Sequence, residues 1–199
     1  MSIAIDYFLS PQSPWTYLGH ERFAEIAAKA GATINVLPVD LGRVFPVSGG
    51  LPLSKRAPQR QAYRLVELKR FSEHLGRPLN LHPRYFPVAS DDAAKLIIAV
   101  DSHDGSAAAM RIAGAILRGV WVEEKNIADP AVLQSLLEAS GLPARRLDDS
   151  QSQAVHERYE ADSQRAIEAG VFGAPSYIYD GELFWGQDRL DFLERRLAR

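Results

Sequence analysis

The sequence contains no cysteine in 199 residues. That absence excludes disulfide bonds, thiolate-ligated zinc and iron–sulfur sites, and any redox cycle on the protein's own sulfur. An excess of charge of either sign is also missing, because 23 Lys and Arg face 25 Asp and Glu for a net charge of −2. We therefore expect neither nucleic acid nor an anionic membrane surface as a partner.

Long hydrophobic runs are missing as well. No apolar stretch approaches the roughly 18 residues that a membrane-spanning helix needs, so we expect no membrane association. Residues 1–6 lack the basic segment followed by an apolar stretch that marks a signal peptide, which favours a cytoplasmic protein. Hydrophobic residues at 46% and charged residues at 24% are ordinary for a globular chain of one domain, or of one domain with an insertion.

The beginning of the chain has a β-α-β pattern. Residues 3–9 are apolar, β-branched or aromatic, apart from Asp6, and predict a buried strand. Ser13 and Pro14 are typical of a helix N-cap and first helical position, and Gly31 of the end of that helix. A second strand is predicted from Thr33 to about Leu41. This order favours a parallel pair of strands with a right-handed crossover.

The middle of the chain is predicted to be helical. Glycines and prolines predict a loop over residues 45–58, and residues 79–88 are Pro-rich and irregular. Helices are expected over residues 59–75, 90–103, 107–122, 129–140 and 149–169. The first of them carries an apolar set made of Tyr63, Leu65, Val66, Leu68 and Phe71.

The end of the chain returns to strands at 176–179 and 183–185, joined by an Asp-Gly turn, with a last helix after Asp188. The element order predicts an α/β, thioredoxin-like fold (β-α-β … α-β-β-α) with an inserted all-helical domain. Residues 1–42 and 171–199 would form the thioredoxin-like domain. Residues 43–170 would form the inserted helical domain and a connecting helix.

Ser13 is the first candidate site residue. Thiol-disulfide oxidoreductases of this fold begin their first helix with Cys-Pro-x-Cys, and here the same place holds Ser13-Pro14-Trp15-Thr16. Unpaired N–H groups and the helix dipole favour an anion at a helix start, and a hydroxyl there can donate a hydrogen bond to a thiolate. Such a setting lowers the thiol pKa of about 8.5 by one or more units. Any sulfur must come from outside the chain; the simpler alternative is an ordinary helix start.

The second candidate element is Gly173-Ala174-Pro175-Ser176, just before a predicted strand. Thioredoxin-like folds keep a cis-proline at this place, beside the active site, and we predict a cis bond at Pro175. The backbone of Ala174 would then be open to pair with a peptide-like ligand as an extra strand. An ordinary trans-proline between loop and strand is the alternative.

The third candidate element is the run from Trp185 to Arg189. Gly186, Gln187 and Asp188 at a helix start place backbone N–H groups beside a carboxylate. The N–H groups suit the carboxylate of a zwitterionic ligand, and Asp188 suits its ammonium group. The alternative is a plain N-cap with an acidic first turn.

Together these segments resemble the 2-hydroxychromene-2-carboxylate isomerases, which are close to kappa-class glutathione transferases and to DsbA-like proteins. The matching segments span nearly the whole chain and are 6–19, 63–70, 76–79, 171–176 and 184–190. The resemblance implies a reversible isomerisation by thiolate addition. It also implies glutathione as cofactor, an aromatic small molecule as substrate, and a homodimer.

The resemblance also implies roles for single residues. Ser13 would bind and activate the glutathione sulfur, with Ser10 as the alternative if the register of the two Ser-Pro pairs differs. Ala174 and Pro175 would meet the cysteinyl backbone of glutathione. The γ-glutamyl end would be held by Gln187 and Asp188.

Other parts of the site stay open. Lys55 and Arg56 would meet the glycine carboxylate of glutathione, or are solvated surface charges. An apolar wall for the aromatic substrate would come from aromatic residues that also suit core packing, namely Trp15, Phe45, Tyr85 and Phe86. No metal site is expected, and His20 is interpreted as a surface or packing residue. A kappa-type transferase or peroxidase and a non-catalytic binding module remain as alternative functions.

Overall fold

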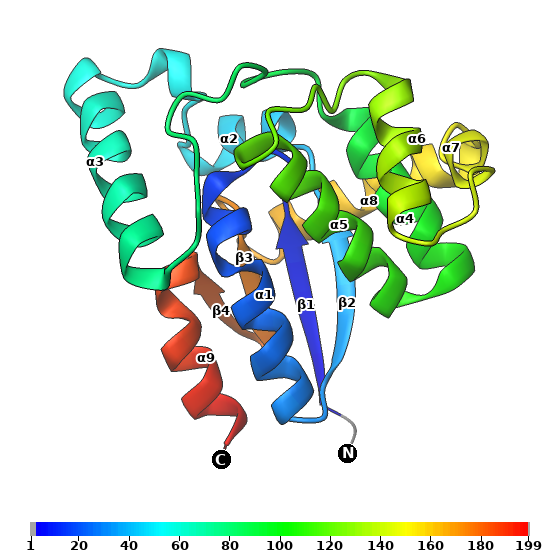
Figure 1. Cartoon of the computed structure of the whole chain (residues 1–199). Coiled ribbons are helices and arrows are strands. Elements are labelled where there is room, and N and C mark those ends of the chain that lie inside the picture. Colours follow the sequence, from blue (N-terminus) through cyan, green and yellow to red (C-terminus); the bar gives the residue numbers. More distant parts are fainter. Residues whose placement is uncertain (1–2, 199) are drawn as a thin grey trace.

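The computed structural model describes residues 3–198 and contains one mixed four-stranded sheet in the order β2-β1-β3-β4 (Figure 1). Strand β1 pairs in parallel with β2, and β3 runs antiparallel to both β1 and β4. The strands are β1 (Ala4–Leu9), β2 (Thr33–Pro38), β3 (Ser176–Tyr179) and β4 (Glu182–Trp185). This topology confirms the predicted thioredoxin-like arrangement.

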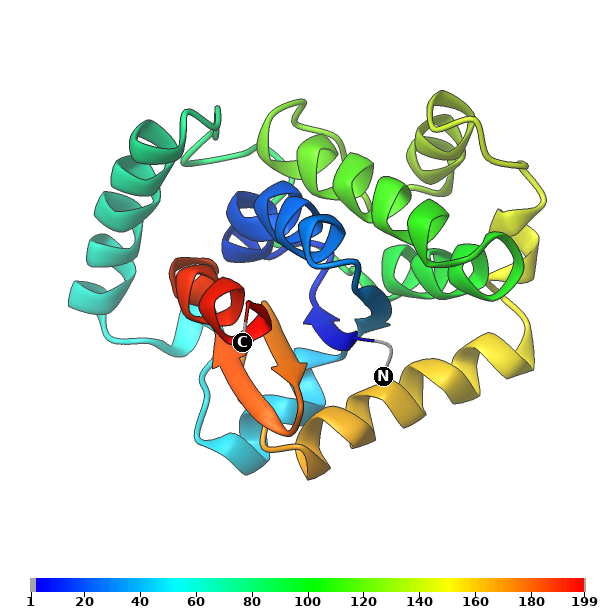
Figure 2. The same cartoon turned by 90° about the horizontal axis from the view of Figure 1, so that it is seen from below.

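Nine α-helices and two short 3₁₀ turns accompany the sheet within residues 3–198. They are α1 (Pro14–Lys29), α2 (Leu41–Ser48), η1 (Leu53–Lys55), α3 (Pro58–Leu75), α4 (Asp91–Asp104), α5 (Ser106–Trp121), α6 (Pro130–Ala139), α7 (Arg146–Asp149), α8 (Gln153–Glu168), η2 (Gln187–Arg189) and α9 (Leu190–Leu197). The two faces of the sheet receive different helices, since α1, α5 and α9 lie over one face and α2 and α8 over the other (Figure 2).

The side-chain alternation of β1 explains these two layers. Tyr7 and Leu9 point into the larger apolar cluster with α1 and α5, whereas Phe8 points into a smaller cluster with Val44 of α2 and Ala166 of α8. Successive side chains of a strand point to opposite faces, so an uninterrupted apolar run is buried on both. The first strand is therefore the centre of the core.

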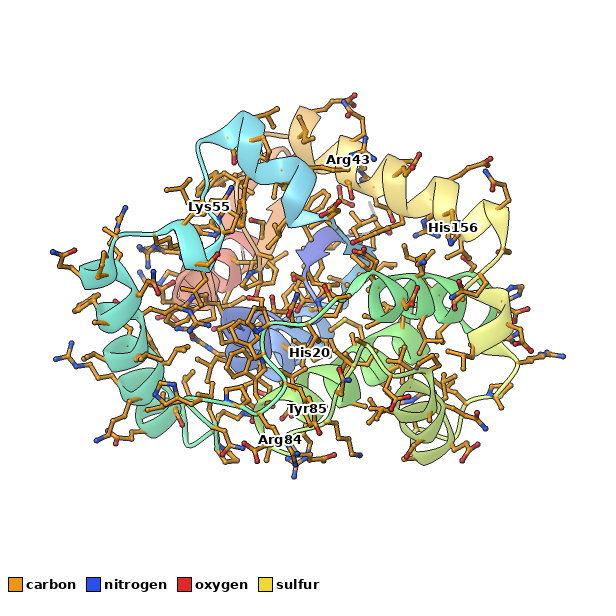
Figure 3. All side chains as sticks on the ribbon, turned by 90° about the horizontal axis from the view of Figure 1, so that it is seen from above. His20, Arg43, Lys55, Arg84, Tyr85 and His156 are labelled. Carbon is orange, nitrogen blue, oxygen red and sulfur yellow. The ribbon has the colours of Figure 1, made fainter. Side chains whose placement is uncertain are left out.

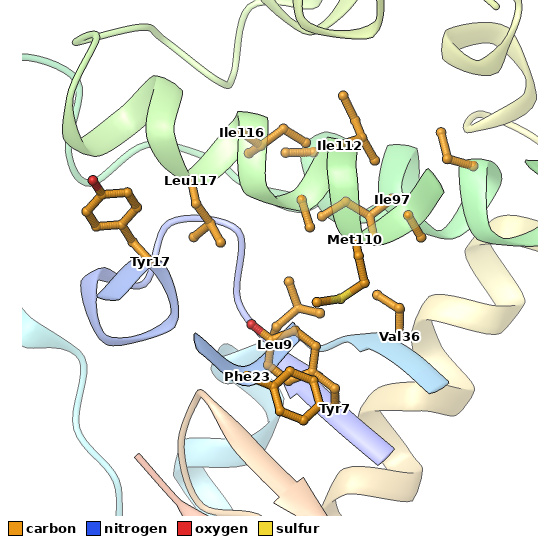
Figure 4. Close-up of a cluster of buried hydrophobic side chains, with 14 of the residues drawn as sticks. Tyr7, Leu9, Tyr17, Phe23, Val36, Ile97, Met110, Ile112, Ile116 and Leu117 are labelled. Carbon is orange, nitrogen blue, oxygen red and sulfur yellow. The ribbon is translucent and has the colours of Figure 1, made fainter. Parts of the chain in front are cut away.

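Aromatic rings fill the space between the sheet and α1 (Figure 4). Tyr7 stacks on Tyr177 with ring centroids 5.4 Å apart, and Phe23 lies 4.7 Å from Tyr7. His20 is buried beside them, with Nδ1 3.0 Å from the Tyr7 hydroxyl and Nε2 2.9 Å from the Met110 carbonyl oxygen. Burial lowers the pKa of His20, which favours the neutral ring. The sequence left open whether His20 is a surface residue or a packing residue, and its burial shows that it is a packing residue.

The predicted loop over residues 45–58 was wrong in part. Helix α2 occupies Leu41–Ser48 and a 3₁₀ turn follows at Leu53–Lys55, while β2 ends at Pro38 rather than near Leu41. The Asp40 carboxylate caps α2 by accepting a hydrogen bond from the Gly42 N–H at 2.7 Å. Together with the full burial of Val44, this cap outweighs the helix-breaking effect of Pro46 inside α2.

Two helix predictions also needed correction. The helix predicted over 149–169 is observed as α8 (Gln153–Glu168), and a turn at 150–152 separates it from the short helix α7, which was not predicted. In α3, Tyr63 and Val66 are 53% and 43% exposed, so they do not belong to the buried face. The pattern of apolar residues alone placed that face wrongly, because the true inner positions of α3 include an arginine, as described below.

The proposed division into two domains stays a prediction. A continuous apolar cluster joins Tyr7 and Phe23 of the sheet region to Ile97 and Ile116 of the helical region. The outermost limits of that division, residues 1 and 199, lie outside the described residues. None of the helices within residues 3–198 combines the length and the apolar character needed to cross a membrane.

Candidate active site

Ser13 lies at the N-terminal tip of α1, at the edge of the sheet where β1 ends. Its N–H donates to the Ser10 carbonyl oxygen at 3.0 Å, which closes a four-residue turn between strand and helix. Its side-chain Oγ accepts a hydrogen bond from the Thr16 N–H at 3.2 Å, as an N-cap serine does. The structure therefore places Ser13, rather than Ser10, at the helix cap.

The Ser13 hydroxyl also faces the loop that precedes β3. Its Oγ donates to the Ala174 carbonyl oxygen at 3.2 Å, and the side chain is 9% exposed. A hydroxyl has only one proton to donate, and both Ser13 Oγ bonds are at the long end of the normal range. A thiolate at this position would accept that hydrogen bond in place of the Ala174 carbonyl oxygen, after rotation of the hydroxyl.

The first turn of α1 keeps a further donor unused. Pro14 has no N–H and the Thr16 N–H is bonded to Ser13, whereas the Trp15 N–H makes no hydrogen bond within residues 3–198. The first turn contains no acidic residue. The helix tip therefore presents an uncompensated N–H group and the positive end of the helix dipole, both of which favour an anion.

The Ala174-Pro175 bond is cis, which confirms that prediction. The N–H of Ala174 has no hydrogen-bond partner in the described part of the chain. The Pro175 carbonyl oxygen accepts from the Gly186 N–H at 2.9 Å, which joins this loop to the third candidate element. All three predicted elements thus meet around the tip of α1.

Gln187 and Asp188 are placed differently from one another. The Gln187 side chain is 2% exposed and packs against Gly19 of α1, where an added Cβ would lie only 2.8 Å from the Gln187 Cβ. Its buried Nε2 has no hydrogen-bond partner among residues 3–198. A ligand could therefore meet the main chain of Gln187 but not its side chain. Asp188 is exposed and forms an ion pair with Arg189.

Of the charged and aromatic candidates, Figure 3 labels Lys55, between α2 and α3, and Tyr85, in the segment between α3 and α4. Lys55 is exposed, and the Arg56 Nε donates to the Leu51 carbonyl oxygen at 2.8 Å. The aromatic candidates are all partly buried, each against a neighbouring group: Trp15 on Phe71, Phe45 on Gly50, Tyr85 under Arg84 and Phe86 on Trp121.

Two residues of this region were missed by the sequence interpretation. Gln12 donates from Nε2 to the Val88 carbonyl oxygen (3.0 Å) and to Ser90 Oγ (3.1 Å), and its Oε1 accepts from the Val88 N–H (3.1 Å). It fastens the loop before α1 to the segment that crosses above it. Arg64 is the second residue, and its only signal in the sequence is a basic residue in line with buried apolar positions of α3.

No group of three or more potential ligands for a metal ion occurs among residues 3–198. A hollow of about 540 Å³ lies elsewhere, on the outer side of β4 and α9, and is lined by Trp185, Arg189 and Phe192 among others. None of the five predicted site residues lines it. The geometry around Ser13, rather than cavity size, therefore defines the candidate site.

The fold places this protein in the thioredoxin-like α/β class. Ser13 caps its first helix at the position where oxidoreductases of this fold have their redox cysteine. The chain belongs to the DSBA-like thioredoxin domain family, whose profile matches residues 4–198. It is 28% identical to a 2-hydroxychromene-2-carboxylate isomerase of Pseudomonas putida, over 98% of this chain and 94% of that protein. It is equally 28% identical to the isomerase of the same name from Sphingobium xenophagum, over 99% of both chains.

Solved structures agree with this assignment. A structure of 2-hydroxychromene-2-carboxylate isomerase superposes with a TM-score of 0.81 at 28% identity, covering 98% of this chain and 95% of the other. A probable DsbA oxidoreductase from Streptomyces coelicolor superposes with a TM-score of 0.78 at 16% identity, covering 98% and 88%. The second likeness concerns the fold alone.

Proposed function

We propose that this protein is a glutathione-dependent isomerase that converts 2-hydroxychromene-2-carboxylate, or a similar aromatic substrate, to trans-o-hydroxybenzylidenepyruvate or the corresponding product. The observation that carries the proposal is the Ser13 hydroxyl at an anion-favouring helix tip, facing the Ala174 backbone, in a chain with no cysteine. The two relatives named as isomerases, which match nearly the whole chain, support it.

The residues around Ser13 fit the cysteinyl part of glutathione. The unpartnered N–H of Ala174 suits a peptide carbonyl group, and the N–H of Trp15 and the hydroxyl of Ser13 suit a thiolate. When bound, glutathione supplies a thiolate that adds reversibly to a conjugated double bond, so that the bond can rotate before the sulfur leaves. The tripeptide is not consumed.

This chain's own residues contribute charge stabilisation and positioning. Ser13 and the first turn of α1 hold the sulfur in its anionic form, which lowers the thiol pKa toward neutral pH. Ala174 orients the cysteinyl backbone, and Asp188 holds the ammonium group of the γ-glutamyl end, with the main chain of Gln187 beside it. The aromatic side chains of Trp15 and Phe86 form an apolar wall for the substrate.

The experiment measures formation of trans-o-hydroxybenzylidenepyruvate from 2-hydroxychromene-2-carboxylate by absorbance, with the purified protein alone, with glutathione and with S-methylglutathione. We expect acceleration only with glutathione, because the methylated tripeptide has the same shape but no free thiol. Equal rates in all three mixtures would contradict the proposal. Conjugation of other electrophiles without isomerisation would instead identify a kappa-type transferase.

The homodimer and the cytoplasmic location stay predictions. Light scattering on the purified protein tests the first, since a dimer doubles the measured mass. Fractionation of the producing cells tests the second.

A further inference from the structure

Arg64 occupies a position of α3 that normally takes an apolar residue. The inner face of this helix is the stripe of residues at positions 64, 68, 71 and 75, which have the three- and four-residue spacing of one helix face. Leu68, Phe71 and Leu75 of this stripe pack against the main apolar cluster, with Leu68 fully buried. Arg64 takes the place nearest the N-terminal end of the helix and is half-buried.

The guanidinium group of Arg64 has aromatic neighbours and no anionic partner. Its Cζ lies 5.4 Å from the ring centroid of Phe86 and 5.9 Å from that of Trp121. Within residues 3–198 it makes no hydrogen bond and no ion pair with a carboxylate. Burial, and then the nearby charge of Arg56, lowers its pKa to about 10. A flat guanidinium held against rings keeps its N–H edge available for bidentate bonds to a carboxylate.

The position of Arg64 relative to Ser13 follows from two contacts and the helix geometry. Trp15, in the first turn of α1, packs edge-on against Phe71 with centroids 5.9 Å apart. Helices α1 and α3 run in the same direction (Figure 1). Arg64 precedes Phe71 by seven residues, or about 10 Å along the helix. It therefore lies beyond the tip of α1, on the side where the free N–H groups point.

The aromatic partner of Arg64 leads back to the same place. Phe86 lies two residues before Val88, whose N–H and carbonyl oxygen are both hydrogen-bonded to the side chain of Gln12. Gln12 is the residue before Ser13. Arg64 is thus connected to the start of α1 through Phe86 and the hydrogen bonds between Gln12 and Val88.

We propose that Arg64, with Arg56 beside it, binds the carboxylate group of a ligand whose reacting atoms lie at Ser13. The inference rests on the proposed function and deepens it, because the carboxylate has two possible sources there. One is the glycine end of glutathione, and the other is the aromatic substrate itself. The ligand carboxylate would supply the negative charge that no residue within 3–198 provides for Arg64.

The test is calorimetric binding to the wild-type protein and to Arg64→Met, which keeps an apolar stem and removes the charge. The probes are glutathione and γ-glutamylcysteine, which lacks the glycine carboxylate, and chromone-2-carboxylate and its neutral carboxamide. Arg70→Met is the matched control, because Arg70 is on the same helix but exposed. Arg64→Lys tests whether the planar fork is needed beyond the charge.

A loss of at least tenfold in affinity for glutathione, with γ-glutamylcysteine unchanged, assigns Arg64 to the glycine carboxylate. A similar loss for chromone-2-carboxylate, with the carboxamide unchanged, assigns it to the aromatic substrate. Changes below twofold for both carboxylates, as expected for Arg70→Met, would overturn the inference. If the wild-type protein binds no glutathione at all, the proposed function fails, and the chromone pair still tests Arg64.

Discussion

Two arginines show how differently two regions of this molecule treat a buried charge. Arg146 in α7 is 4% exposed and binds the Asp104 carboxylate through Nε at 2.6 Å and Nη2 at 2.8 Å, and Asp149 through Nη1 at 2.7 Å. Hydrogen bonds from Arg146 lower the pKa of Asp104, and those same bonds raise the pKa of Arg146. Arg64, above the tip of α1, has no such partner, and its pKa is lowered.

The contrast suggests a structural role for Arg146 and a ligand-binding role for Arg64. Around α7 the chain supplies each of the three guanidinium nitrogens of Arg146 with a carboxylate acceptor, which fixes the corner between α4 and α7. Above α1 the described chain leaves the guanidinium of Arg64 and the N–H groups of Trp15 and Ala174 without partners. Unpaired donors that are at least partly buried reduce stability, so the presence of these three near the tip of α1 favours a role in binding.

The first prediction tests this contrast directly through the free energy of unfolding. Arg146→Met should lower it by about 3–5 kcal/mol, because two carboxylates lose their only strong partner. Arg64→Met should change it by less than about 1 kcal/mol, because it removes a desolvated cation without breaking a pair. Urea denaturation of the two variants measures both values, and equal losses would remove the distinction.

The second prediction concerns the hydroxyl at the tip of α1. Ser13→Ala should lower glutathione-dependent turnover by about 100-fold or more, since it removes a hydrogen-bond donor from the developing sulfur anion. Ser10→Ala is the matched control and should change turnover by less than about threefold. Steady-state kinetics compares them. A larger loss in Ser10→Ala would mean that the other Ser-Pro pair is the sulfur site.

The third prediction tests how firmly the crossing segment is held above the site. Gln12→Leu should lower the free energy of unfolding by about 1–3 kcal/mol, because it leaves the Val88 N–H and carbonyl oxygen without their partner. It should also speed hydrogen exchange at the Val88 N–H. Mass-spectrometric exchange measures the second effect. Unchanged exchange there would show that Gln12 does not fasten this segment.

The smallest expected change in stability concerns Asp162 of α8. This buried carboxyl group has a distant cationic partner, so it lies between the paired Arg146 and the unpaired Arg64. Its Oδ2 lies 3.4 Å from the Arg158 Nε, yet burial raises its pKa to about 6 from 3.8. The folded protein then binds this proton more tightly than the unfolded chain does, so stability falls as the pH rises from about 4 through 6.

Asp162→Asn should remove that pH dependence. We expect a gain of about 1–2 kcal/mol in the free energy of unfolding at pH 7 and no gain near pH 4. Arg158 loses one of its two carboxylate partners in this variant and keeps Asp101, and this loss keeps the gain below the full effect of the pKa shift. Unfolding curves at both pH values test the sign, and a loss at pH 7 would place Asp162 with Arg146 as a satisfied ion pair.

Local chemistry made most of the fold predictable. The Ser13-Pro14 helix start, the Asp180-Gly181 turn and the apolar first strand each have one favoured structure, and each was predicted correctly. Helix α2 was missed because the Asp40 cap and the burial of Val44 outweigh Pro46. The short helix α7 was missed because the ion pair that ties it to α4, between Arg146 and Asp104, joins residues 42 positions apart.

The candidate site was predictable in its parts rather than in its geometry. Ser13, Ala174 and Asp188 belong to local patterns, so their separate roles could be inferred. The burial of the Gln187 side chain against Gly19 depends on how α1 packs against η2, and no local pattern contains that information.

The sequence by itself determined the absence of internal thiol chemistry, the order of strands and helices, and the serine at the start of the first helix, because each depends on composition or on neighbouring residues. Only the tertiary structure decided which donors remain unpaired, because the partner of a buried charge comes from any part of the chain. Arg146 and Arg64 are the same residue type in helical segments, and packing alone gave Arg146 two carboxylate partners and left Arg64 against aromatic rings with no carboxylate among residues 3–198.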